Sequence, residues 1–108
     1  MKKQVSVTGS KGTFTATVEV RKNVGTTTIN IHNRGTHDDE KKQVAEHEVV
    51  VIYEGQEVPV LSSGKFTGES NIIDRAEKVE RATKNWLSAK ANSKYIDTTE
   101  ELKRRGWS

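Results

Sequence analysis

The sequence predicts an α+β domain in which an antiparallel sheet of about five strands, connected as a meander, is covered by one long C-terminal helix. A short helix follows. Three observations predict this class. Apolar and polar residues alternate before residue 61, turn residues separate the alternating segments, and an apolar stripe with helical spacing begins at Ile72. The length of 108 residues suits a single domain, 1–108, that is strand-rich over 1–61 and helical over 70–108.

The expected strands are short and each is bounded by turn residues. They are Lys3–Thr8, the alternating segment that ends with Val18-Glu19-Val20, Thr26–His32, Glu46–Tyr53 and Val58-Pro59-Val60. Turns are expected at 9–12, 22–25 and 53–57, and the polar stretch 33–42 is expected to form an exposed loop. Pro59 cannot donate a ladder hydrogen bond, so the fifth strand should lie at an edge of the sheet.

Two strands carry further information about burial. The second strand has Phe14, Ala16, Val18 and Val20 in one phase and threonines in the other, which predicts one buried face and one wet face. The fourth has the continuous apolar run 49–52, which is typical of a strand that is covered on both faces or central in the sheet.

The C-terminal third predicts two helices. The first spans about Ile72–Ala91, with Ser70 or Asn71 as its cap and Trp86 in the apolar stripe. The second is short, Thr99–Arg105, and should end at Gly106.

Composition limits where the chain can work. It contains no cysteine, which excludes disulfides and thiolate metal sites, and its longest apolar run is too short to span a bilayer. We therefore expect a soluble, cytoplasmic protein with no membrane partner. Hydrophobic residues make up only 31% of the chain, and the mean hydropathy is −0.78. Because the core must then be thin, homodimerisation is one way to cover remaining apolar surface.

Charge is distributed unevenly along the sequence. Residues 1–35 carry six bases and one acid, residues 36–71 carry eight acids and three bases, and residues 84–108 carry six bases and three acids. Both ends are thus basic and the middle is acidic, a pattern that can orient a charged partner.

No motif in the sequence predicts catalysis or a cofactor. Glycine-rich nucleotide loops and Gly-x-Ser-x-Gly are missing from the sequence. His37 stands beside three carboxylates, so a metal- or ligand-dependent activity at this acidic loop stays an alternative, although its spacing fits no calcium loop. His47 shares the phase of Val49 and is expected at the edge of the core. We expect a non-enzymatic protein without a cofactor.

The leading hypothesis is a binding or accessory module that acts by contact with another protein. Aromatic and arginine side chains anchor interfaces, which singles out Tyr95, Trp107, Arg104 and Arg105. The alternative is nucleic-acid binding through the two basic ends of the chain. Its candidate residues are Lys2, Lys3, Lys103, Arg104 and Arg105.

Overall fold

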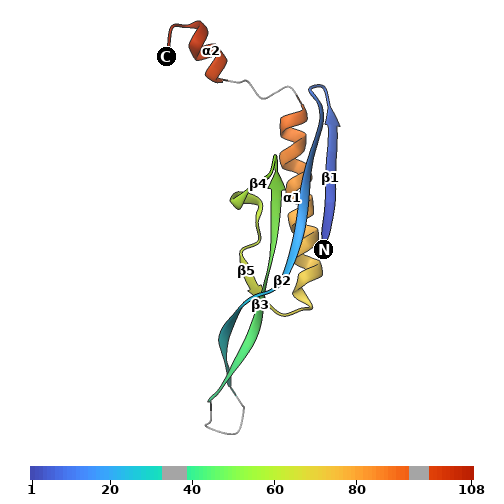
Figure 1. Cartoon of the computed structure of the whole chain (residues 1–108), viewed down its shortest axis with the longest axis vertical. Helices are drawn as coiled ribbons and strands as arrows, with labels where there is room; N and C mark the ends of the chain where they lie inside the picture. Colours follow the sequence, from blue (N-terminus) through green and yellow to red (C-terminus); the bar gives the residue numbers. More distant parts are fainter. Residues whose placement is uncertain (33–38, 93–97) are drawn as a thin grey trace.

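The computed structural model describes residues 1–32, 39–92 and 98–108 of the chain, which form an α+β fold (Figure 1). An antiparallel sheet is followed by one long helix and one short helix, as the sequence predicts. The elements are β1 (Lys2–Gly9), β2 (Gly12–His32), β3 (Asp39–Tyr53), β4 (Gln56–Glu57), the 3₁₀ turn η1 (Pro59–Leu61), β5 (Lys65–Thr67), α1 (Asn71–Ala91) and α2 (Thr98–Arg104).

The sheet has five strands connected largely as a meander. Its order is β1-β2-β3-β4, and β5 pairs with β3 on the same side as β4. β4 pairs with Ile52 and Tyr53, whereas β5 pairs with residues 46–48, so the two short strands share one edge of β3. β1 forms the opposite edge, where the carbonyl oxygen of Met1 accepts a 2.8 Å hydrogen bond from the Val20 N–H.

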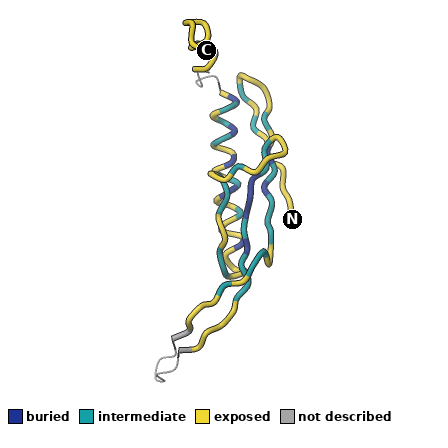
Figure 2. Tube along the Cα trace, turned by 60° about the vertical axis from the view of Figure 1, so that its left-hand side comes forward, coloured by how far each residue is buried: buried dark blue, intermediate teal, exposed yellow. Residues whose placement is uncertain are grey.

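The core lies between this sheet and α1. The register pairs Val5 with Ala16 and Val18 with Val51, so these four side chains share one face of three neighbouring strands. All four are buried, and α1 contributes Val79 and Leu87 from its apolar stripe. Figure 2 shows the buried residues gathered where α1 faces the sheet.

β2 and β3 continue past the helix as a two-stranded arm, which we define as residues 25–32 and 39–46 (Figure 1). The sequence predicts a turn at residues 22–25 that separates two strands, and this is wrong: β2 runs through it. The register shifts between Arg21 and Gly25 instead, and Asn23 takes a φ of 58° within this β-bulge. Residues 39–42, expected in a loop, belong to β3.

The expected fifth strand at Val58-Pro59-Val60 is also wrong. Pro59 instead begins η1, where its fixed φ suits the first position of a helical turn. The edge next to β3 is formed by β4 before this turn and by β5 after it. Both strands are only two or three residues long, too short for alternation to reveal them.

α1 begins and ends close to the predicted residues. Ser70 precedes the helix but makes no side-chain capping hydrogen bond; Asn71 Nδ2 instead donates to the Thr67 carbonyl oxygen at 2.9 Å. At the other end the Asn92 N–H donates to the Ser88 carbonyl oxygen at 3.0 Å.

Candidate protein-binding site

The C-terminal end of α2 has a fixed geometry. The N–H of Gly106 donates to the Lys103 carbonyl oxygen at 3.1 Å, and the N–H of Trp107 donates to the Leu102 carbonyl oxygen at 3.0 Å. Gly106 has a φ of 91°, in the left-handed region that glycine adopts without strain. These two bonds are the Schellman arrangement, which brings the residue after the glycine back toward the last helical turn. Trp107 is thereby held near Leu102.

This apolar pair is open to solvent. Trp107 is 68% exposed and Leu102 is 46% exposed. Tryptophan is normally among the more buried residues because its ring has a large apolar surface. The indole of Trp107 lies at a helix end that is fixed by backbone hydrogen bonds. Most of its apolar surface is thus open to contact.

Three cations accompany the pair: Lys103, Arg104 and Arg105 are all exposed. Lys103 and Arg104 lie in the last turn of α2, where positive charge is stabilised by the helix dipole. The structure therefore brings Trp107, Arg104 and Arg105 together with Lys103 at one end of the chain. Tyr95, the fourth residue predicted for this site, lies outside the described residues.

The two basic ends of the chain do not form one patch in the described structure. Lys3 lies beside α1, where its Nζ is 2.7 Å from Glu80 Oε1. Glu80 is roughly three helical turns before Ala91, the last residue of α1. Lys2 and Lys3 are thus placed away from the end of α1 that leads to α2, and Lys3 already has an ion-pair partner.

A second candidate surface lies where β1 begins. It is an open apolar hollow of about 420 Å³ beside the first half of α1, which we call the edge groove. Its lining residues are Met1, Val20, Lys22, Glu69, Ile72, Ile73, Ala76, Glu77 and Glu80. Ile73 is 70% exposed and Met1 is 87% exposed, so two large apolar side chains border it without being covered.

The position of the edge groove follows from where the sheet ends. β1 covers β2 only as far as the Met1–Val20 pair, so β2 continues beyond Val20 without β1 beside it. The first turns of α1 lie next to this uncovered part of β2, and their residue Ile73 is exposed to solvent. The sequence places Ile72 and Ile73 on a widened apolar stripe, but it does not predict that Met1 and Val20 line the same groove.

Acidic side chains border the edge groove. Lys22 Nζ donates a 3.0 Å hydrogen bond to Glu69, which lowers the pKa of that carboxyl group. Lys3 does the same for Glu80 and lowers its pKa as well. The exposed Glu77 is the third carboxylate of the lining, and the other two, Glu69 and Glu80, are paired with lysines.

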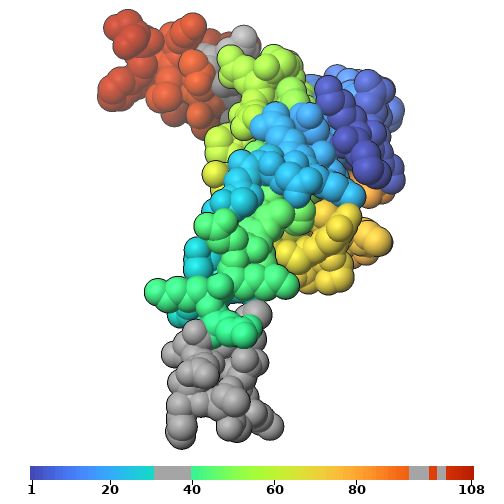
Figure 3. Space-filling view, turned by 60° about the horizontal axis from the view of Figure 1, so that its bottom comes forward, coloured from blue at the N-terminus to red at the C-terminus, as the bar shows by residue number. Residues whose placement is uncertain are grey.

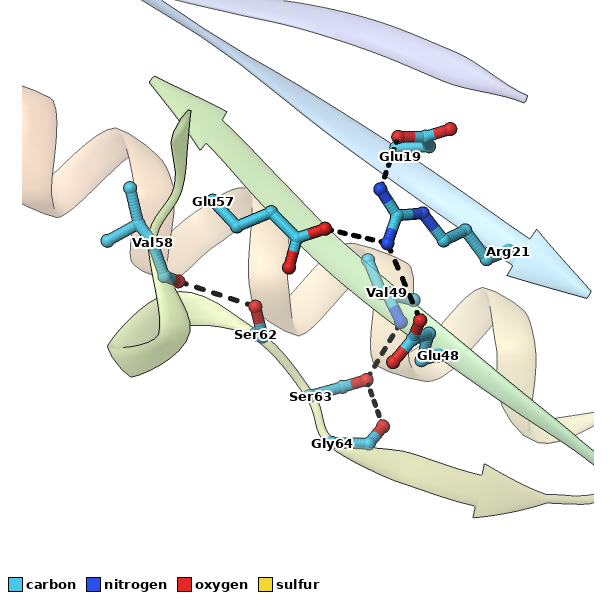
Figure 4. A network of polar contacts seen from close by, with 9 residues as sticks. All are labelled: Glu19, Arg21, Glu48, Val49, Glu57, Val58, Ser62, Ser63 and Gly64. Atoms are coloured by element: carbon cyan, nitrogen blue, oxygen red, sulfur yellow. Dashed lines mark hydrogen bonds and ion pairs between the residues drawn. The ribbon is translucent and has the colours of Figure 1, made fainter. Parts of the chain in front are cut away.

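The face of the sheet away from α1 carries a polar network centred on Arg21 (Figure 4). Its guanidinium donates to Glu57 at 2.7 Å and to Glu19 at 3.3 Å, and it lies 3.6 Å from Glu48. The hydrogen bond to Glu57 is the main cause of a raised pKa of Arg21. Val50, which pairs with Glu19 on this face, is buried although α1 covers only the other face of the sheet.

Tyr53 and Trp86 pack at the other end of the sheet. Their rings meet edge to face at 5.0 Å, and Lys90 Nζ lies 4.4 Å from the Trp86 centroid. Burial, with a smaller effect of Glu54, raises the pKa of Tyr53. Trp86 packs against the core, as predicted from its place in the apolar stripe.

The histidines offer no metal site in the part of the chain that is described. His47 is buried at the core edge, as predicted, and its Nδ1 accepts a 3.1 Å hydrogen bond from the Asn23 N–H. His37 and its acidic neighbour Asp38 lie outside the described residues. Within residues 1–32, 39–92 and 98–108, no group of metal-ligating side chains is assembled. Neither helix of the same residues has the length and apolarity needed to cross a membrane.

Comparison of the chain with models of protein families, with curated proteins and with solved structures gave no match.

Proposed function

We propose that this chain is a non-enzymatic, cytoplasmic binding module that docks on another protein through α2. The observation that carries the proposal is the exposure of Trp107 at a helix end whose backbone is fixed by the Gly106 turn. Trp107 is the anchor, Leu102 extends its apolar surface, and Arg104 and Arg105 provide charge at its border.

The chemistry of the tail supports a protein partner. Tryptophan and arginine are the residues that most often dominate the free energy of protein interfaces. A fixed backbone lowers the conformational entropy that is lost when such an anchor binds. A helix end that presents Trp107 and Leu102 fits an apolar groove in a partner, and the cations favour a groove with an acidic border.

Affinity capture with a matched control tests this function. The wild-type chain, Trp107→Ala and Val60→Ala are immobilised and incubated with nuclease-treated lysate of the native host. Val60 is the control because it is 81% exposed and lies on η1, away from α2. We expect proteins that are held by the wild type and by Val60→Ala but lost with Trp107→Ala. Identical protein sets for all three baits contradict the proposal.

Nucleic-acid binding is the second candidate, because Lys103, Arg104 and Arg105 stand beside an exposed ring that is able to stack on bases. The separation of Lys2 and Lys3 from this cluster weighs against it. Its signature is a steep loss of affinity with added salt, because counterions are released on binding. Titration of labelled single- and double-stranded DNA and RNA at two salt concentrations tests it. Tight, salt-sensitive binding that Trp107→Ala weakens favours this candidate over the first.

A further inference from the structure

Along the arm, the outer edge of β2 lies open among the described residues. β1 ends at the Met1–Val20 pair, so from Gly25 onward the described neighbour of β2 is β3 alone. In Figure 3 the arm, coloured teal and green, stands apart from the N-terminal segment and from α2. The main-chain donors and acceptors of this edge therefore face solvent.

Hydrogen bonds on the far side of β3 identify which residues point to the open edge. The N–H and the carbonyl oxygen of Val49 bond to Ser63, on the side of β3 away from β2. Because the main chain of a strand points to alternate sides at successive residues, the even-numbered residues of β3 point toward β2. On the arm these pair with Thr27 and Ile29, among others. The main-chain groups of the intervening residues of β2 thus point outward: Thr26, Thr28 and Asn30.

The composition of this edge favours strand pairing. Residues 24–31 contain no charged side chain, and six of the eight are β-branched. Uncharged segments with high β-propensity are the ones that pair with another strand when they lie at an edge. The other edges carry the charges that block such pairing, because 40–42 of β3 are all charged and β1 begins with Lys2 and Lys3.

The arm also lacks the support that the rest of the sheet receives from α1. Its described side chains are exposed or half-buried, and the buried residues gather on the body (Figure 2). A ribbon of two strands is only marginally stable in water, and further strands that share an apolar face stabilise it. Thr27 pairs with Val44 on one face of the arm, and Ile29 on the same face is 38% exposed. An added strand would cover this face at its edge.

We propose that the β2 edges of two copies of the chain pair antiparallel about a two-fold axis at Ile29. In this register Thr28 of each copy lies opposite Asn30 of the other, so their outward N–H and carbonyl groups exchange hydrogen bonds. Ile29 faces Ile29 of the second copy in a pair without hydrogen bonds, the kind that brings side chains closest. The sequence of the edge is thus complementary to itself.

The pairing ends at a dimer. It uses the β2 edge of each copy and leaves the β3 strands as the outer strands of a four-stranded ribbon. Their charged residues 40–42 oppose the addition of further strands. A two-fold contact between identical surfaces also closes on itself, whereas a contact between different edges would continue into a fibre. This inference goes beyond the proposed function, because it uses a surface other than α2.

Sedimentation equilibrium of the full chain over a range of concentrations is the first test. The wild type should pass reversibly from monomer to dimer. Thr28→Pro removes an outward donor from each copy, so two hydrogen bonds of the dimer are lost and dimerisation should weaken by about tenfold or more. Gln43→Pro is the matched control. It removes an outward donor on the β3 edge of the same arm, spares the ladder between β2 and β3, and should dimerise like the wild type.

A mixture of two charge variants tests the position of the axis. Ile29→Lys and Ile29→Glu each place like charges opposite one another in the dimer, so each variant alone should be monomeric where the wild type is dimeric. Mixed in equal amounts, they should form heterodimers, because residue 29 of one copy then faces the opposite charge. This recovery also shows that the arm of both variants keeps its fold.

Hydrogen exchange provides a readout at single residues. The amides of Thr28 and Asn30 should exchange fast in dilute solution and slowly where the dimer forms, whereas the Gln43 amide should exchange fast in both. A wild type that stays monomeric, species larger than a dimer, or a dimer that survives both Thr28→Pro and Ile29→Lys overturns the inference. The last result would move the interface elsewhere, for example to the outer edge of β1.

One further variant separates this inference from the proposed function. Trp107→Ala should lose captured proteins and still dimerise like the wild type. Loss of the dimer in Trp107→Ala overturns the inference, because α2 would then be the interface between copies. A dimer that depends on Ile29, together with unchanged capture by Trp107→Ala, supports the inference while the proposed function fails.

Discussion

The amide N–H of Lys11 donates a 2.8 Å hydrogen bond to the carbonyl oxygen of Ala91, the last residue of α1. The turn between β1 and β2 thus satisfies one of the carbonyl groups that a helix leaves without a partner at its end. Gly9 lies in the same contact, where a Cβ atom would be 2.5 Å from the Ala91 oxygen. The close approach of turn and helix requires the absence of a side chain at this position.

Gly9→Ala should therefore destabilise the fold. Because the added Cβ would meet backbone atoms that cannot rotate away, the turn and the end of α1 must separate, at an expected cost of about 1–3 kcal/mol. Gly25→Ala is the matched control, since its Cβ would meet only ordinary contacts, the nearest at 3.7 Å from Glu46. Chemical denaturation of both variants measures the difference. Equal stabilities would show that the turn does not restrain α1.

Arg21→Ala should lower the melting temperature more than Arg21→Lys. Removal of the guanidinium leaves Glu19, Glu48 and Glu57 close together without their shared cation. Lysine keeps the charge and the aliphatic stem but not the forked donor. Thermal unfolding, monitored by circular dichroism, ranks the melting temperatures of the two variants. The deficit of Arg21→Ala should shrink in high salt, which screens the carboxylates; a deficit that is independent of salt would point to lost packing alone.

Stability should decrease in acid partly through Glu80. Lys3 lowers the pKa of Glu80 in the folded chain below its ordinary value of 4.5. A carboxyl group with a lowered folded pKa contributes stability above its ordinary pKa, and this contribution is lost as the pH falls through the folded value. The free energy of unfolding should thus decrease below about pH 4.5, and less steeply in Lys3→Gln than in the wild type. Lys41→Gln, on the arm, is the control, and its free energy of unfolding should depend on pH as it does in the wild type.

His47→Leu should destabilise the bulge at the base of the arm. The substitution keeps an apolar side chain beside Phe66 but removes the Nδ1 acceptor of the Asn23 N–H. A partly buried donor left without a partner costs about 1–3 kcal/mol. His47→Gln, whose amide oxygen is able to accept a hydrogen bond, should lose less. Hydrogen exchange of the Asn23 amide checks the mechanism, because it should accelerate in His47→Leu and stay slow if another acceptor replaces the ring.

The sequence predicted the layers of the fold because each layer has its own periodicity. Alternation in β1 and the first half of β2 and the stripe of α1 are local patterns, and packing turned both toward one core. The bulge resembles a turn in sequence for a related reason. Asn23 and Gly25 mark positions that tolerate unusual backbone angles, but whether the chain reverses or continues there depends on the pairing with β3.

The candidate site was predicted only in part. Gly106 and the cations before it mark the end of α2 within a few residues, which is why the sequence offers Trp107, Arg104 and Arg105 as candidates, and their role stays a prediction. The edge groove depends on Met1 lying near Ile73, residues that are far apart in the chain and brought together only by the sheet edge and α1. A local sequence pattern does not predict that two residues so far apart in the chain lie close together in the fold.

The arm formed by β2 and β3 affects how the molecule moves through water. Together with α2 it gives the chain dimensions of 70 × 30 × 23 Å and a radius of gyration of 20.2 Å, whereas a compact domain of 100 residues has a radius of gyration of about 13 Å. Friction grows with elongation, so a monomer should elute from a gel-filtration column ahead of globular standards of equal mass. An early elution volume alone is therefore no evidence of self-association.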